Sequence, residues 1–216
     1  MKNILYALFV VAVFFTLNGC GGSRSGGGVA LAPNELAKLS DFNSNQFNHK
    51  AYVRGMAKVA RNTLYWQDPN AHMGDFHFVN VVGPEDRYLP INPNFVHEPY
   101  VKGFAGFFNN NLDLKQKSTG KTLLVKTAVV ECNPGSRAAR YWVGMGAGKA
   151  VATVVIEVYE PGKTTPSLKL YARDSASAGG FGGDSMSMMN HIMQVMAVRV
   201  TTVLEGRIDI DKTGRN

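Results

Sequence analysis

Three runs in the second half of the chain alternate between apolar and polar side chains. In residues 150–159 every second side chain is apolar, which is the two-residue period of a strand with one buried face. Residues 122–131 repeat this pattern, and residues 168–173 alternate again after a proline-containing turn at 161–166. We expect residues 150–159 and 168–173 to pair as a hairpin, with 122–131 and the apolar run at 75–82 as further strands.

A helix is predicted around Pro99, because proline's missing N–H does no harm in a first helical turn. The apolar residues that follow at helical spacing are Val101, Phe104, Phe107 and Phe108. The asparagines at 109–111 tolerate the left-handed conformation that often follows a helix, so we expect the helix to end there. The phenylalanines are then core residues that pack on the sheet.

A last helix is predicted after Asp184, a residue type that caps helix N-termini well. Steps of three and four separate its apolar residues, which are Met186, Met189, Met193, Met196, Val200 and Val203. Gly206 is placed to end this helix. A methionine stripe can be an adaptable docking face or a core filler. We interpret it as core, because a sheet with one apolar face needs a cover.

The first part of the chain gives a weaker pattern. Residues 33–42 predict a short helical approach to the domain, and residues 49–66 fit both the helix period and the strand period. We favour a helix for residues 49–66. Residues 83–94 are predicted as a loop, because Pro84, Pro90 and Pro93 interrupt regular structure there.

Taken together, these elements predict an α/β (α+β) fold. It would contain a small mixed sheet of about four to five strands with a glycine-rich hairpin loop, covered by helices that include the methionine-rich C-terminal one. Residues 75–210 are predicted to form this domain. Residues 34–74 form an N-terminal extension whose fold the sequence leaves open.

The first twenty residues resemble a bacterial lipoprotein leader. A short basic start is followed by an apolar run at 4–17 that is too short for a permanent membrane span. Gly19 supplies the small residue before a cleavage site, and Cys20 follows it, as in the lipobox. The resemblance implies a signal peptide at 1–19, acyl chains on Cys20, and a glycine-rich tether within 20–33. The residue after Cys20 is Gly21 and not aspartate. In such lipoproteins this implies sorting to the outer membrane, with the domain facing the periplasm.

The charge and the cysteine count indicate which kinds of partner to expect. The chain has 216 residues, 18% of them charged, and a formal net charge of +7. Its basic residues are scattered along the sequence, which favours attraction to anionic envelope surfaces over nucleic acid. With Cys20 consumed by lipid, Cys132 would be left without a disulfide partner, and we expect it to be an inert, half-buried thiol.

The stretch between two predicted strands, residues 135–149, is the candidate contact site. It is a loop by its glycines, yet it carries apolar and aromatic side chains that would be costly to leave in water as one patch. The residues assigned to partner or oligomer contact are Arg137, Arg140, Tyr141, Trp142, Val143 and Met145. The two arginines can clamp an anion or a partner's carboxylate, or can be solvated or paired within the chain. Whether the glycine-rich part contacts protein or membrane is left open.

The glycines at 144–148 do not form a phosphate-binding loop. A Walker motif requires glycine where Val143 stands and serine or threonine where Ala150 stands. The run also leads into a predicted strand, so it is not followed by a helix N-terminus that could bind a phosphate. We therefore expect no nucleotide partner.

Other chemical motifs are weak. His72, Asp75 and His77 could suggest a metal site, but two histidines and one carboxylate without a further signature are more typical of solvated residues. Ser185 lacks the second glycine of a nucleophile elbow. We predict no metal, no cofactor and no catalysis.

Residues 135–159, with their run Arg-Tyr-Trp-Val-Gly-Met-Gly-Ala-Gly-Lys-Ala, resemble the bacterial lipoprotein family called domain of unknown function 4410. The resemblance extends over about residues 95–204. Residues 139–147 are also similar to a loop of the curli-secretion channel lipoprotein, where that loop belongs to a membrane-inserting hairpin of an oligomeric pore. The fold of that channel lipoprotein is shared with periplasmic activators of peptidoglycan synthases. The present chain departs from the pore pattern, because the residues between 172 and 184 are too few for a second hairpin.

These observations lead to one expectation and two alternatives. We expect a lipid-anchored, non-catalytic outer-membrane lipoprotein that works by protein–protein contact in an envelope assembly as an oligomer. Its partners would be membrane lipid through Cys20 and envelope proteins or further copies of itself. The alternatives are a subunit of a curli-type secretion pore and a hydrolase.

Overall fold

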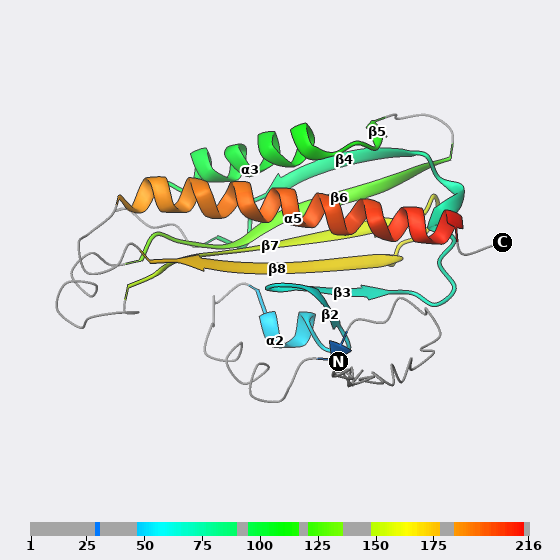
Figure 1. The fold of residues 1–216 in the computed structure, drawn as a ribbon, viewed down its shortest axis with the longest axis horizontal. Coiled ribbons are helices and arrows are strands. Elements are labelled where there is room, and N and C mark those ends of the chain that lie inside the picture. The colour runs from blue at the N-terminus through cyan, green and yellow to red at the C-terminus, as the bar shows by residue number, and fades with distance from the viewer. Residues whose placement is uncertain are drawn as a thin grey trace, which may run out of the picture.

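An eight-stranded mixed sheet organises this computed structural model, which describes residues 29–30, 47–89, 95–116, 121–135, 148–177 and 184–213 (Figure 1). The strand order across the sheet is β1-β2-β3-β8-β7-β6-β4-β5. The strands are β1 (Val29–Ala30), β2 (Ala57–Ala60), β3 (Thr63–Gln67), β4 (Phe78–Glu85), β5 (Lys115–Gln116), β6 (Thr122–Asn133), β7 (Ala150–Tyr159) and β8 (Leu168–Ala176). β4 pairs in parallel with β5 and β6, and the other neighbours are antiparallel.

The predicted α+β class is confirmed, but the sheet is wider than the four to five strands expected. The helix predicted for residues 49–66 is wrong, and this accounts for part of the difference. Only α2 (His49–Tyr52) is helical there, and β2 and β3 follow it. Gly55 at φ +78° and Asn62 at φ +56° turn the chain twice, which a continuous helix would not allow.

The central strands follow the predicted alternation. β7 has the predicted bounds, and the expected hairpin is confirmed by its antiparallel pairing with β8, in which Ile156 lies opposite Leu170. Both of these side chains are fully buried. They belong to the larger of two apolar clusters, which fills the space between the sheet and the long helices.

Two long helices, α3 (Glu98–Asn111) and α5 (Ser185–Thr213), lie together over one face of the sheet (Figure 1). A short 3-10 turn, η1 (Met73–Asp75), packs against α5. The side chains that these helices bury almost completely are Phe104, Phe108, Met189, Met193, Met196 and Val200. The core interpretation of the methionine stripe is therefore confirmed, with Met186 as an exception at 62% exposure.

The start of α5 is as predicted, and its end is not. The Asp184 carboxylate accepts hydrogen bonds from the backbone N–H groups of Met186 and Ser187, both at 3.1 Å, so it caps the helix. Gly206 does not end the helix, which continues to Thr213. The next residue, Arg207, places its guanidinium 3.9 Å from the centre of the Tyr65 ring, and this contact holds the helix beyond the glycine.

α3 has Pro99 in its first turn, as predicted, and extends through Asn111. The left-handed ending expected after the asparagines is absent, because Leu112 is extended with φ −88°. The Asn111 side-chain amide instead donates a hydrogen bond of 2.7 Å to the Phe107 carbonyl. That bond ties the last helical turn to the Asn111 side chain, and no left-handed residue follows.

β4 begins later and ends later than predicted. It starts at Phe78 and runs through Glu85, so the first residues of the predicted 83–94 loop are strand. Proline cannot donate to a ladder and is tolerated at irregular positions. Pro84 lies where the β4–β6 register shifts between Val82 and Glu85, so its missing N–H removes no regular ladder bond.

The face of the sheet opposite the long helices carries the smaller apolar cluster. Residues 47–56, which include α2, lie over this face. The cluster consists of Val53, Met56, Leu64, Ala128, Val130, Val155 and Tyr171, with Phe47, Tyr52, Trp66 and Tyr88 packed against it. The sheet is thus covered on both faces, by the long helices on one and partly by an N-terminal segment on the other.

Candidate functional site

The residues assigned to contact in the sequence, Arg137, Arg140, Tyr141, Trp142, Val143 and Met145, lie outside the described residues, as does the lipidation candidate Cys20. The same holds for the predicted signal peptide and for the helical approach at 33–42. These assignments stay predictions. The structure does describe the two ends of the loop that carries the contact residues.

The base of that loop is held closed by two glycines. Gly135 has φ +74° and Gly148 has φ +66°. The Asn133 side-chain oxygen accepts a hydrogen bond of 2.9 Å from the Gly135 N–H, which forms a tight turn after β6. A Cβ atom at position 135 would collide with the backbone carbonyl oxygens of Gly148 and Lys149. The entering and leaving chains therefore lie side by side, closer than any side chain at position 135 permits.

The second glycine-rich loop leaves the sheet at the same end. Asn133 pairs with Val151, and Ala150 pairs with Ala176, so residues 136–147 and 178–183 follow from one end of β6, β7 and β8. We call this end of the sheet the loop end. α3 and α5 also begin there (Figure 1).

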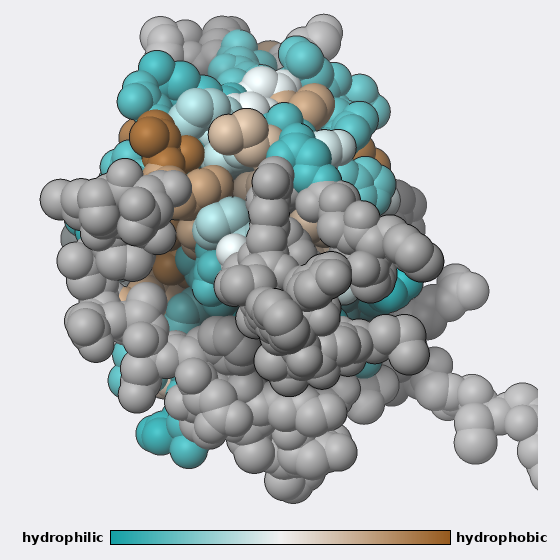
Figure 2. Space-filling model, turned by 90° about the vertical axis from the view of Figure 1, so that its left-hand side faces the viewer, coloured by the Kyte–Doolittle hydropathy of each residue, from teal (hydrophilic) through white to brown (hydrophobic). Residues whose placement is uncertain are grey.

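The described residues at the loop end expose apolar side chains. Val96, just before α3, is 67% exposed, and Met186, in the first turn of α5, is 62% exposed. Figure 2 looks at this end and shows hydrophobic surface among the described residues. The neighbourhood in which the sequence placed a contact loop is therefore already apolar on its flanks.

Behind this surface lies Cys132, half-buried and free of any disulfide in the part of the chain that the structure describes. Burial raises the pKa of its thiol to about 12, and the charge of Glu131 acts in the same direction. The thiol is therefore protonated at neutral pH, and a protonated thiol is a poor nucleophile. This agrees with the inert role predicted for it.

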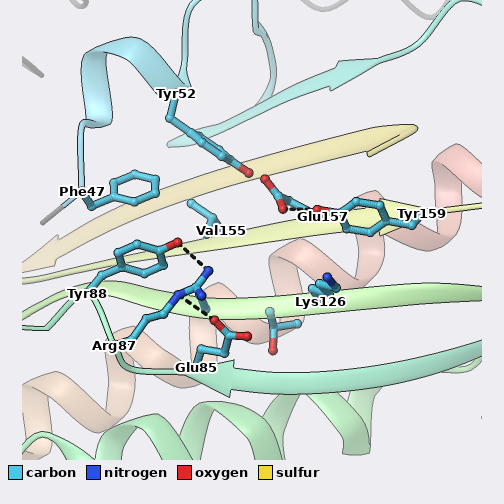
Figure 3. A pocket seen from close by; sticks show the side chains of 11 residues that line it. Phe47, Tyr52, Glu85, Arg87, Tyr88, Lys126, Val155, Glu157 and Tyr159 are labelled. Carbon is cyan, nitrogen blue, oxygen red and sulfur yellow. Dashed lines mark hydrogen bonds and ion pairs between the residues drawn. The ribbon is translucent and has the colours of Figure 1, made fainter. Parts of the chain in front are cut away.

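A second candidate site is a pocket of about 300 Å³ on the face of the sheet opposite α3 and α5 (Figure 3). Its walls come from residues 47–52, from the end of β4 with the turn after it, and from β6 and β7. The lining residues are Phe47, Tyr52, Glu85, Arg87, Tyr88, Lys126, Thr127, Ala128, Val155, Glu157 and Tyr159. The pocket thus combines aromatic rings with charges of both signs.

Neighbouring side chains pair many of these charges. Arg87 forms an ion pair of 2.9 Å with Glu85 and donates a hydrogen bond of 2.7 Å to the Tyr88 hydroxyl (Figure 3). The Tyr159 hydroxyl donates a hydrogen bond of 2.6 Å to Glu157. These contacts orient the polar groups at the rim before any ligand arrives.

Lys126 and Tyr52 complete the pocket. The Lys126 ammonium lies 4.8 Å from the centre of the Tyr159 ring. The buried Tyr52 hydroxyl points toward Glu157 (Figure 3). Burial, reinforced by the charge of Glu157, raises the pKa of Tyr52, and burial with the Glu157 hydrogen bond raises the pKa of Tyr159. Both phenols stay protonated at neutral pH, so they can donate hydrogen bonds but cannot act as bases.

Sequence reasoning missed this pocket. Its signal was the second side of the strand at 150–159, where Val155, Glu157 and Tyr159 alternate with the core residues. An amphipathic strand face of this kind has no diagnostic spacing. The pocket forms only because residues 47–52, part of which the sequence assigns to a longer helix, cross that face.

The weaker metal candidate is not assembled into a site. His72, Asp75 and His77 are all exposed to solvent. Among the residues that the structure describes, no three histidine, cysteine or acidic side chains are grouped so that they could hold a metal ion.

None of the helices described is both long enough and apolar enough to span a bilayer.

The model of the protein family described as "Domain of unknown function (DUF4410)" matches residues 105–191. This match confirms the resemblance inferred from residues 135–159. Among curated proteins, no relative of the sequence is found.

Several solved structures are similar to part of the chain, and they include the following two. One is a PelC dodecamer from Paraburkholderia phytofirmans, with a TM-score of 0.40, 10% identity, and coverage of 64% of this chain and 92% of that chain. The other is a minor lipoprotein from Acinetobacter baumannii, with a TM-score of 0.34, 9% identity, and coverage of 62% and 95%. These likenesses are too distant to indicate what the present chain binds. The similarity to the curli-secretion channel loop stays a prediction.

Proposed function

We propose that this chain is an outer-membrane lipoprotein whose DUF4410 domain binds protein partners or further copies of itself, without catalysis. One observation carries the proposal: both glycine-rich loops leave the sheet at the loop end, beside exposed Val96 and Met186. One of these loops contains Tyr141, Trp142 and Met145. Aromatic residues and methionine are enriched where proteins bind one another, so their sequence placement supports a contact surface there.

The proposed location rests on the leader. Cys20 after Gly19 would carry the acyl chains, and a doubly acylated protein stays stably on a membrane. Replacement of Cys20 by alanine should move the protein from the membrane fraction to the soluble periplasmic fraction. Membrane attachment of the Cys20→Ala protein that survives a high-salt wash would contradict the anchor.

The contact surface can be tested on the unlipidated chain that begins at Gly21. Light scattering should give a mass above that of the monomer, and Trp142→Ser with Met145→Ser should lower it while the circular dichroism spectrum stays the same. Val198→Ser is the matched control, because Val198 is 42% exposed in the middle of α5. An unchanged mass in the double variant, together with unchanged crosslinking to envelope proteins, would remove the loop from consideration.

The pore alternative has less support. β8 ends at Ala176 and α5 begins at Ser185, which leaves residues 177–184 between them. A bilayer-crossing strand requires about 9–11 residues, and a hairpin requires two of them. Liposome conductance of the lipidated protein separates the two functions, because a binding module produces no current.

A further inference from the structure

The edge of the sheet nearest the proposed anchor is basic. Residues 47–67 contain no aspartate or glutamate, and their four basic residues are Lys50, Arg54, Lys58 and Arg61. All four side chains are exposed. They come from α2, the turn after it, β2 and the turn before β3, which succeed one another along one side of the molecule (Figure 1).

The surrounding residues leave much of this charge uncompensated. Within the described residues, no acidic side chain forms an ion pair with Lys50, Arg54 or Arg61. The chain as a whole carries a formal net charge of +7, so this short segment supplies a large part of the excess. An exposed cluster of one sign attracts a surface of the other sign.

The chain path keeps this cluster within reach of the proposed anchor. β1 pairs with β2, and Val29 lies directly opposite Lys58. Only residues 21–28 separate Val29 from Cys20. A fully extended chain spans at most about 3.6 Å per residue, so the lipid-bearing residue can lie no more than roughly 30 Å from this edge.

We propose that Lys50, Arg54, Lys58 and Arg61 form a membrane-facing edge that binds anionic phospholipid headgroups. The orientation rests on the anchor at Cys20 put forward above. With this edge against the bilayer, the strands run along the membrane surface, and the loop end points sideways, toward neighbouring proteins (Figure 1). Basic residues near an anionic leaflet each add to the attraction, which falls off within a Debye length of about 10 Å at 0.1 M salt.

The test uses the unlipidated chain from Gly21 onward, so that binding reports the edge and not the acyl chains. We expect it to sediment with vesicles that contain phosphatidylglycerol, to stay in solution with vesicles of phosphatidylcholine alone, and to be released as salt is raised. Replacing all four basic residues by glutamine should weaken the binding by about two orders of magnitude or more.

A charge-matched control separates this edge from net charge. It replaces four exposed lysines elsewhere in the described residues by glutamine, namely Lys102, Lys121, Lys126 and Lys163. We expect a much smaller loss for the control. Equal losses in the two variants, or equal binding of the parent chain to both kinds of vesicle, would overturn the proposal.

Two further measurements keep the outcome clear. If the edge variant does not fold by circular dichroism, Lys50→Gln and Arg54→Gln are measured singly, and each should weaken vesicle binding about fivefold. Single variants that bind as tightly as the parent would count against the edge. Because the protein in the vesicle assay has no lipid, a negative vesicle result does not test the Cys20 anchor. Likewise, a negative result in the Cys20→Ala fractionation does not affect the vesicle measurement.

Discussion

A hydrogen bond of 3.0 Å joins Nδ1 of His49 to the hydroxyl of Tyr171 and ties α2 to β8. His49 is 2% exposed, and the rings of Phe47 and Tyr171 meet its imidazole edge-on at 4.9 and 5.9 Å between centroids. Its Nε2 is buried without a hydrogen-bond partner in the described part of the chain. The segment that forms one wall of the pocket is thus held to the sheet by a buried imidazole.

Burial lowers the pKa of His49 below its usual 6.5, with Glu131 opposing the shift and Arg173 adding to it. The unfolded chain therefore takes up a proton near pH 6.5 while the folded chain does not. The free energy of unfolding should fall as the pH drops through this value, and the loss should stop once the folded pKa is passed. Urea unfolding between about pH 7.5 and 5 measures this slope.

His49→Gln is the matched variant, because it keeps a polar side chain and removes the titration. Its free energy of unfolding should depend less on pH in that range than the parent's. The same pH slope in both proteins would show that His49 is not responsible.

Gly135 should tolerate no side chain. Alanine there would place a Cβ against the carbonyls of Gly148 and Lys149, in addition to the left-handed backbone at φ +74°. Gly55 is the control, since it has φ +78° but a Cβ added there would meet no atom within 4 Å. We expect Gly55→Ala to cost about 1–2 kcal/mol of unfolding free energy, from backbone strain alone, and Gly135→Ala to cost more. Equal losses by denaturant unfolding would mean that the loop base opens to accept the methyl group.

Cys132 should react slowly in the folded protein. Burial raises the pKa of its thiol to about 12, so few molecules carry the thiolate at pH 8. In the chain from Gly21 onward, alkylation by iodoacetamide should be slow without denaturant and fast in urea. Rapid labelling of the native protein would indicate that the β6 end opens, which mass spectrometry can detect.

The sequence predicts the central part of the fold best. The alternation predicts the strand at 150–159 to the residue, because its core side is continuously apolar and packs in the main cluster. The failures lie where local preference and tertiary context disagree. Residues 49–66 satisfy a helical period, but Gly55 and Asn62 turn the chain, and pairing with β8 converts the rest to strands.

Helix ends were harder to predict than helix positions. Gly206 is a typical helix-ending residue, yet the Arg207 guanidinium stacks on the Tyr65 ring and the helix continues. That contact joins residues more than a hundred positions apart, so no local pattern records it. The same reason explains the missed pocket, whose walls come from four segments. The composition of the loop at 136–147, by contrast, indicates a contact site, and the structure adds the position of its two ends.

Both margins of the sheet are closed by very short strands, β1 and β5, with two residues each. Strands this short offer an incoming chain few main-chain groups to pair with, and natural proteins use this device against uncontrolled aggregation. Copies of this molecule therefore have little edge strand through which their sheets could pair into one continuous sheet. Assemblies that they form would be held by side chains, and a single substitution could take them apart without unfolding any subunit.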